Sequence, residues 1–289
     1  MKARFAQRAA ARVMSVAAGV TVAVVAACSG IPSDPNTPFA IEFNRAPSPS
    51  VVLGTPMFDS LGVVTRLKAI VYNSKGDVIA GAPVTYHVVP HDTIPLVVDT
   101  TTGQITGKPD ALYAARTARV YAQSGGLQSQ AITVTVTRRA DSLIAVEPLA
   151  DTLPLRFTSP DSLPLSPSFS VRVRHDPGAP GAPADSTVPA YLVRFKIIQP
   201  GGAEVNDTSY VMLTNGDRRR SELDTADASG LASRQVRVRR LNFPFGKAAD
   251  GSGFIHDTIL IRASAYREGP ALVPGSGLLF RLIITARAP

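Results

Sequence analysis

The sequence predicts an all-β protein in which two sandwich domains follow a short N-terminal leader. Apolar and polar residues alternate over short runs, which is the pattern of strands with one buried and one wet face. The 22 Gly and 24 Pro residues suit many strands joined by turns. About 260 residues remain after the leader, which favours two domains over one.

The leader comprises residues 1–27 and has the layout of a secretory signal peptide. Its basic head contains Lys and Arg but no acid, and the stretch 13–27 that follows has no charge and is mostly Ala and Val. This run of about 15 residues is shorter than the ~20 that a helix needs to cross a bilayer. We therefore expect residues 1–27 to be removed from the exported chain.

The tetrad Val25-Ala26-Ala27-Cys28 resembles the lipobox of bacterial lipoproteins. The resemblance implies that Cys28 carries a diacylglyceryl group, that cleavage occurs before it, and that its new amine is acylated, as by palmitate. Two or three acyl chains hold a protein firmly on a membrane, whereas one binds only marginally. By analogy with these lipoproteins, Ser29 instead of Asp favours the outer membrane, on its periplasmic face or at the cell surface. The alternatives are an ordinary signal peptide with an incidental cysteine, and an uncleaved anchor.

Charge and cysteine content narrow the classes of partner. The leader holds four of the 30 Lys and Arg residues and none of the 22 acids, so the net charge falls from +8 to +4 in the mature chain. This modest charge gives no reason to expect a nucleic-acid partner. Cys28 is the only cysteine, so no disulfide can form within the chain and packing alone must make the core.

Residues 28–38 are predicted to be a lipidated tether, and Pro-rich residues 31–38 within it should stay extended and solvated. The first domain is predicted over residues 39–138. Period-two runs at 65–71 and 83–89 indicate strands, and residues 118–137 indicate a hairpin around a Gly pair. Short strands at this spacing favour an antiparallel sandwich.

The first domain resembles bacterial immunoglobulin-like (Big) domains. Residues 76–86, 98–107 and 122–136 are similar, in this order, to three signature segments of that family, with Tyr86 in place of its usual aromatic. The resemblance implies an Ig-like sandwich. In physical terms the glycines form turns that need a positive φ, and the aromatic side chain fills the core.

The second domain is predicted over residues 141–289, with alternating strands near 142–147, 168–174, 191–197, 235–239, 257–265 and 278–284. Residues 225–233 resemble the T-x-D-A-x-G-x-A-x segment of invasin-type Big domains (Big-1 and Big-2 types). The domain is longer than a minimal sandwich of ~100 residues. We place the excess in loops at 159–167, 176–189 and 242–256.

The third of these loops is the candidate partner-contact surface, because binding residues often sit on loops above a rigid scaffold. The alternative is that its phenylalanines tuck under the sheet as a cap. The contact residues we single out are Arg239, Arg240, Phe243, Phe245 and Lys247.

The sequence offers no catalytic, metal or cofactor motif. The four histidines form no dense ligand cluster, and there is no G-x-S-x-G nucleophile turn, phosphate loop or EF-hand pattern. Calcium held between the domains by oxygens from distant loops stays open. Residues 218–220 and the Val-Arg alternation could attract anionic lipid or polysaccharide, but a solvated outer sheet face and a polar turn would give the same pattern.

These features favour a non-enzymatic protein without a cofactor, anchored to the envelope membrane by lipid, that presents a binding or adhesion module or acts as a spacer. Its partner would be a protein or polysaccharide of the envelope. The resemblance to invasin-type domains implies adhesion, although such domains also serve as stalks. The rival classes are an accessory subunit that pairs through a sheet edge and, more weakly, a carbohydrate-binding module or a hydrolase on a sandwich.

Overall fold

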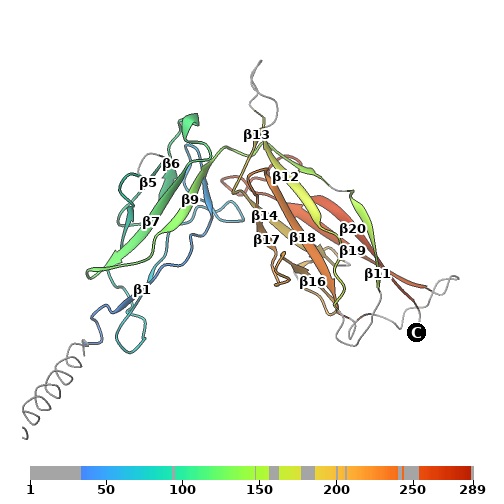
Figure 1. The fold of residues 1–289 in the computed structure, drawn as a ribbon, viewed down its shortest axis with the longest axis horizontal. Coiled ribbons are helices and arrows are strands. Elements are labelled where there is room, and N and C mark those ends of the chain that lie inside the picture. The colour runs from blue at the N-terminus through green and yellow to red at the C-terminus, as the bar shows by residue number, and fades with distance from the viewer. Residues whose placement is uncertain are drawn as a thin grey trace, which may run out of the picture. The chain divides into compact units, whose positions relative to one another are not determined.

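The structure is a computed structural model that describes residues 34–92, 95–146, 148–155, 163–176, 186–199, 201–205, 207–239, 243 and 254–287. This part of the chain is all-β apart from the 3-10 helix η1 (Ala111–Tyr113). Each sheet lies wholly before or wholly after the junction at residues 138–141 (Figure 1). The fold class of two tandem Ig-like sandwiches is therefore confirmed, while the domain limits 39–138 and 141–289 stay a prediction.

In the part of the chain that the structure describes, the first sandwich contains nine strands. They are β1 (Ala40–Glu42), β2 (Ser50–Val52), β3 (Ile70–Tyr72), β4 (Thr85–Val88), β5 (Leu96–Val98), β6 (Ile105–Gly107), β7 (Thr117–Ser124), β8 (Leu127–Gln128) and β9 (Ile132–Thr137). The run predicted at 65–71 becomes a strand only from Ile70, although Leu67 and Val71 are buried as their alternation requires.

Eleven strands of the second sandwich lie in its described segments. They are β10 (Ser142–Ala145), β11 (Ala150–Leu155), β12 (Phe169–His175), β13 (Ser186–Thr187), β14 (Leu192–Ile198), β15 (Glu204–Val205), β16 (Val211–Thr214), β17 (Leu223–Thr225), β18 (Leu231–Val238), β19 (Phe254–Ser264) and β20 (Leu278–Arg287). The strand runs predicted from alternation all fall on these elements.

By compactness the chain divides into two units, and these do not coincide with the two sandwiches, because the first unit combines three separate segments of the chain. Of the described chain, the first unit contains residues 34–43, 69–84 and 122–129, and the second contains the other residues. In the first unit, β1 pairs antiparallel with β3, and β8 pairs with the end of β7. Gly76, the first glycine of the segment 76–86, forms a turn of the kind expected for these glycines: its amide donates to the Asn73 carbonyl (3.0 Å) and its φ is +86°.

The end of the tether, residues 34–38, is turned and held by one contact instead of extended. The Thr37 amide donates to the Asp34 carbonyl (3.1 Å) and closes a turn. Buried Asn73 donates its Nδ2 to the carbonyl of Pro35 (3.2 Å). This contact satisfies a buried side-chain amide, which would otherwise cost free energy. Residues 34–36 are exposed, as a solvated tether requires, but the turn and the contact with Asn73 show that residues 34–37 are not extended.

In the second unit, the sheet that precedes the junction has the order β2-β9-β7-β4, and β5 pairs with β6. Strand β2 runs parallel to β9, whereas β9 and β7 form the predicted antiparallel hairpin. Tyr86 is only 6% exposed, and a Cβ added at Gly103 would lie 2.9 Å from its ring. The expectation that this aromatic side chain fills the core is confirmed.

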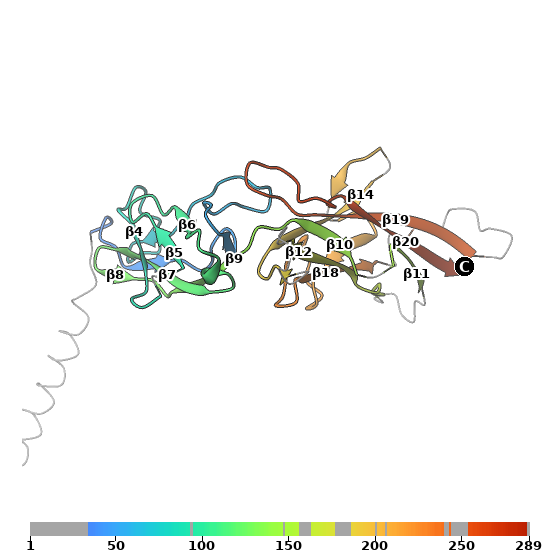
Figure 2. The ribbon, with the colours of Figure 1, turned by 90° about the horizontal axis from the view of Figure 1, so that it is seen from above.

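Two facing sheets make the second sandwich. One has the order β10-β12-β18-β16 with β13 on β12, and the other has the order β11-β20-β19-β14-β15 with β17 on β14. Figure 2 shows the long β19–β20 hairpin, which pairs from Phe254↔Arg287 to Ala263↔Leu278. This hairpin provides a rigid base for the shorter strands beside it.

The core of the second sandwich follows the period of two that the sequence predicts. Most inward residues of the described strands are buried, including Phe169, Phe195 and Phe280, while Ala145 and Leu278 pack against the core partly buried. The rings of Phe169 and Phe280 lie 5.5 Å apart across the two sheets. Burying a side chain of this size stabilises the fold by roughly 2–3 kcal/mol.

Strand β11 was missed in the sequence because Pro154 argues against a strand. It pairs parallel with β20, and its Leu153 and Leu155 are buried. Only β20 pairs with β11 among the described strands, so it is an edge strand. Proline is tolerated at such an edge, because its missing N–H faces away from the ladder.

Replacement of Gly230 by Ala should destabilise the second sandwich strongly. Gly230 has a φ of +72°, and an added Cβ would lie 2.6 Å from the carbonyl oxygen of Val173. We expect a loss of about 3 kcal/mol in unfolding free energy, made up of about 1 for the left-handed backbone and about 2 for the clash. Urea unfolding would measure it.

The matched control is Gly202→Ala, because Gly202 has a φ of +88° but open space around the added Cβ. It should cost only about 1 kcal/mol. Equal losses for the two variants would contradict the clash.

Candidate functional site

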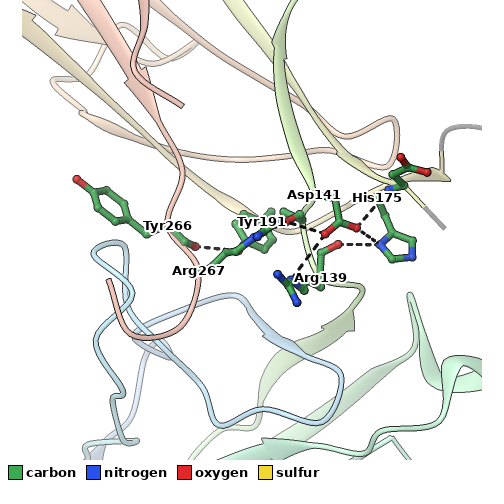
Figure 3. A network of polar contacts seen from close by, with 8 residues as sticks. Arg139, Asp141, His175, Tyr191, Tyr266 and Arg267 are labelled. Atoms are coloured by element: carbon green, nitrogen blue, oxygen red, sulfur yellow. Dashed lines mark hydrogen bonds and ion pairs between the residues drawn. The ribbon is translucent and has the colours of Figure 1, made fainter. Parts of the chain in front are cut away.

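The densest polar cluster that the structure describes is centred on Asp141, just before β10 (Figure 3). Its Oδ2 accepts from His175 Nδ1 (2.7 Å) and its Oδ1 from an Arg267 guanidinium nitrogen (3.0 Å). Arg139 Nε lies 3.7 Å from Oδ1. We call Arg139, Asp141, His175 and Arg267 the Asp141 network.

The network ties three segments of the second sandwich together. Arg267, in the loop between β19 and β20, also donates its Nε to the carbonyl of Ala140 (2.8 Å). His175, at the end of β12, lies 3.0 Å from the carbonyl of Arg139 through Nδ1. The amide of Asp176 donates to Asp141 Oδ2 (3.2 Å). One carboxylate thereby fixes the start of the sandwich, the end of β12 and the β19–β20 loop.

A second contact secures the same loop. The hydroxyl of buried Tyr191 donates to the carbonyl of Tyr266 (2.8 Å), as Figure 3 shows. Burial raises the pKa of the Tyr191 hydroxyl above its ordinary value, since the phenolate would be formed away from water. Tyr191 therefore stays a neutral donor, and the loop is held independently of pH in the physiological range.

The chemistry of the Asp141 network is that of a structural clasp. Both carboxylate oxygens already have partners, Arg267 at Oδ1 and His175 at Oδ2, and within the described chain no hydroxyl or thiol hydrogen-bonds to His175 Nε2. An Asp–His pair needs such a nucleophile to support acyl transfer. Nor do the described residues contain a group of three or more His, Cys, Asp or Glu side chains that could hold a metal ion.

A second ion cluster lies on the sheet that contains β14. Glu222 accepts from Arg194 (2.7 Å) and from Lys196, both on β14. Burial by itself raises the pKa of the Glu222 carboxyl, but hydrogen bonds from Arg194 and Lys196 outweigh burial and hold the pKa below its ordinary value. Glu222 therefore stays ionised and bridges the two cations.

Of the five candidate contact residues, the structure describes Arg239 and Phe243. Phe243 is 5% exposed, belongs to the core cluster and meets the ring of Tyr210 edge-on at 5.8 Å. It occupies the capping position that was the alternative for this loop, so its ring does not form a contact surface. Arg240, Phe245 and Lys247 lie outside the described residues, and their role stays a prediction.

Arg239 is engaged within the protein. Its guanidinium lies 3.1 Å from Asp207 and donates to the carbonyl of Thr208 (3.2 Å). It remains partly exposed, at 32% of its side chain. The sequence placed Arg239 in a contact loop through its neighbours in the chain, but its contacts come from the segment before β16, which only the tertiary structure brings beside it.

The described residues contain no helix of sufficient length and apolar character to span a membrane. Cys28 and the rest of the predicted signal peptide lie outside the described residues, so lipidation stays a prediction.

Comparison with known proteins adds little to this picture. No family model matches the chain, and no curated protein matches it. Among solved structures it is similar to protocadherin gamma B2 cadherin domains 1–5 (17% identity, 85% of this chain and 39% of that one, TM-score 0.25). It is also similar to human protocadherin-24 EC1-2, with 15% identity over 87% of this chain and 99% of that one (TM-score 0.25). A third similar structure is domains 4–9 of surface layer protein SbsC, with 10% identity over 86% of this chain and 31% of that one (TM-score 0.25). Likenesses at this TM-score carry no argument, and the fold rests on the sheets and cores described above.

Replacing Asp141 by Ala should loosen the start of the second sandwich. It removes the acceptor of two cations and leaves Arg267 and His175 partly buried without it, a loss that typically costs about 2 kcal/mol. Chemical denaturation would measure the change. Asp217→Ala is the control, because Asp217 is exposed in a turn, and should change stability by less than about 0.5 kcal/mol. Equal effects would show that the network does not act as a clasp.

Glu222 should make stability depend on pH. Its folded-state pKa lies below its unfolded value, so its contribution is full above the unfolded pKa, near 4.3, and is lost as pH falls through the folded pKa. The stability advantage of the native chain over Glu222→Gln should therefore be largest near neutral pH and shrink below about pH 4.5. Urea midpoints of both chains across this range would test it, and a constant difference would contradict it.

Proposed function

We propose that this protein is a lipid-anchored module of the bacterial cell envelope, at the outer membrane, which binds a partner or spaces one from the membrane without catalysis. The observation that carries the proposal is the position of Cys28, the only cysteine, at the end of a charge-free leader segment. Acyl chains on that thiol would give the chain its membrane attachment.

The docked end of the tether supports an arrangement close to the membrane. The first unit holds the chain at Pro35, only seven residues after Cys28. Seven residues span at most about 25 Å when fully extended. A lipidated Cys28 would therefore keep the first unit within about that distance of the bilayer surface.

The character of the described residues supports a non-catalytic role. The strongest polar cluster is saturated with internal partners, and the long paired strands give a stiff scaffold. Binding proteins commonly present loops on such a scaffold. An accessory subunit of an envelope assembly is the rival role, and it would show as stoichiometric co-purification with one partner protein.

Replacing Cys28 by Ser should release the protein from the membrane. The hydroxyl cannot replace the thiol as the acceptor of the diacylglyceryl group, so the chain should move from the detergent phase to the aqueous phase. Phase separation of cell extracts with a cloud-point detergent would measure this. Ser29→Ala is the matched control and should stay in the detergent phase.

Detergent-phase recovery of the Cys28→Ser chain would refute lipid anchoring. Protease treatment of intact cells that express the native chain would then separate the cell surface from the periplasmic face, because only a surface-exposed chain is degraded.

A further inference from the structure

The turn after β16 brings together an arginine cluster, which we define as Arg218, Arg219, Arg220, Arg237 and Arg239. Strand β16 pairs antiparallel with β18, with Met212 opposite Arg237, so the two arginines near the end of β18 lie beside β16. Beyond β16 the chain turns back, and Arg220 forms a bridge with Thr214. The side chain of Arg237 donates to the carbonyl of Arg218 (3.2 Å) and ties the turn to β18.

The turn itself is fixed by Asn215. Its carbonyl accepts from the Arg218 amide (2.9 Å), and its Oδ1 accepts from the Arg219 amide (2.8 Å). Arg218 has a φ of +61°, in the left-handed region that a residue with a long side chain rarely adopts. Three consecutive arginines are thus presented on a hydrogen-bonded turn, and all three are exposed.

Internal acids balance only part of this charge. Asp207 lies 3.1 Å from Arg239 and 3.4 Å from Arg220, so one carboxylate serves two guanidiniums. Within the described chain, Arg218 and Arg219 have no ion-pair partner. The other nearby acid is Asp217, which is exposed in the same turn. Five cations against two carboxylates leave a local excess of positive charge that favours an anionic partner.

We propose that the arginine cluster is a docking surface for an acidic polysaccharide, one that carries repeating carboxylate or phosphate groups. The proposal deepens the proposed function, on which it rests, by giving the binding module the chemical class of its partner. Guanidinium groups suit such anions because their planar fork donates two parallel hydrogen bonds to one carboxylate or phosphate.

The surroundings of the cluster favour a glycan over a bilayer. Proteins that rest on a membrane usually add apolar side chains to their basic residues. None of the large exposed apolar side chains in the described chain belongs to the turn 215–220 or to β16 and β18, and a single one, Leu163, adjoins Pro164, whose carbonyl accepts from the Val238 amide. Several guanidiniums spread over an exposed turn also match a polymer with repeated anions better than a single small ion.

The test uses the full-length Cys28→Ser chain, which carries no acyl chain and needs no detergent, and measures its binding to polygalacturonate, to neutral dextran and to phosphatidylglycerol vesicles. We expect binding to polygalacturonate, which weakens as salt is added because exposed charges are screened, and none to dextran. The double variant Arg218→Gln/Arg219→Gln should weaken binding roughly three- to tenfold, since each exposed pair contributes little by itself. Asp217→Asn should strengthen binding.

The matched control is Lys68→Gln/Lys75→Gln, which removes the same charge from two exposed residues of the first sandwich. It should leave binding unchanged. Equal losses in both double variants would assign binding to overall charge and overturn the proposal, as would binding to vesicles but not to polygalacturonate. Absence of binding to polygalacturonate also overturns the proposal. It does not bear on lipid anchoring, which the phase separation of the Cys28→Ser chain tests separately.

Discussion

Close packing between two sheets is the constraint on which the rest of this molecule depends. The chain has one cysteine, in the leader region, so no covalent link joins the sheets. The second sandwich is held instead by interdigitated side chains such as Phe169, Phe195 and Phe280, all fully buried. Because unfolding free energies of domains are only about 5–15 kcal/mol, a few such side chains decide whether the scaffold exists.

Polar contacts then fix the ends of the strands that the core leaves undefined. Asp141 gathers Arg267 and His175 from segments more than 30 residues away in the sequence and holds them with charge-assisted hydrogen bonds. Such bonds are stronger than neutral ones and are directional. A carboxylate engaged in this way stabilises the fold, because it holds three segments of the second sandwich together.

In the arginine cluster, positive charge exceeds the negative charge of the nearby carboxylates. Asp141 is one carboxylate that gathers several partners, whereas in the arginine cluster Arg220 and Arg239 share the single carboxylate of Asp207, and Arg218 and Arg219 have no ion-pair partner within the described chain. A protein that is anchored by lipid and carries no catalytic group would act through surfaces of this kind. The proposed roles are consistent with one another, since an anchor at one end of the chain and a charged turn in the second sandwich would link a membrane to an anionic polymer.

Period-two alternation determined the all-β class, the order of the long strands and their inward faces, because burial on a sheet repeats every second residue whatever the topology. Gly76 and Tyr86 had their roles predicted from local patterns alone. Only the tertiary structure placed β11, the docked residues 34–38 and buried Phe243, since each depends on partners distant in sequence: β20, Asn73 and Tyr210. The arginine cluster and the Asp141 network likewise arise from strand register and loop position, which alternation cannot encode because many registers bury the same face.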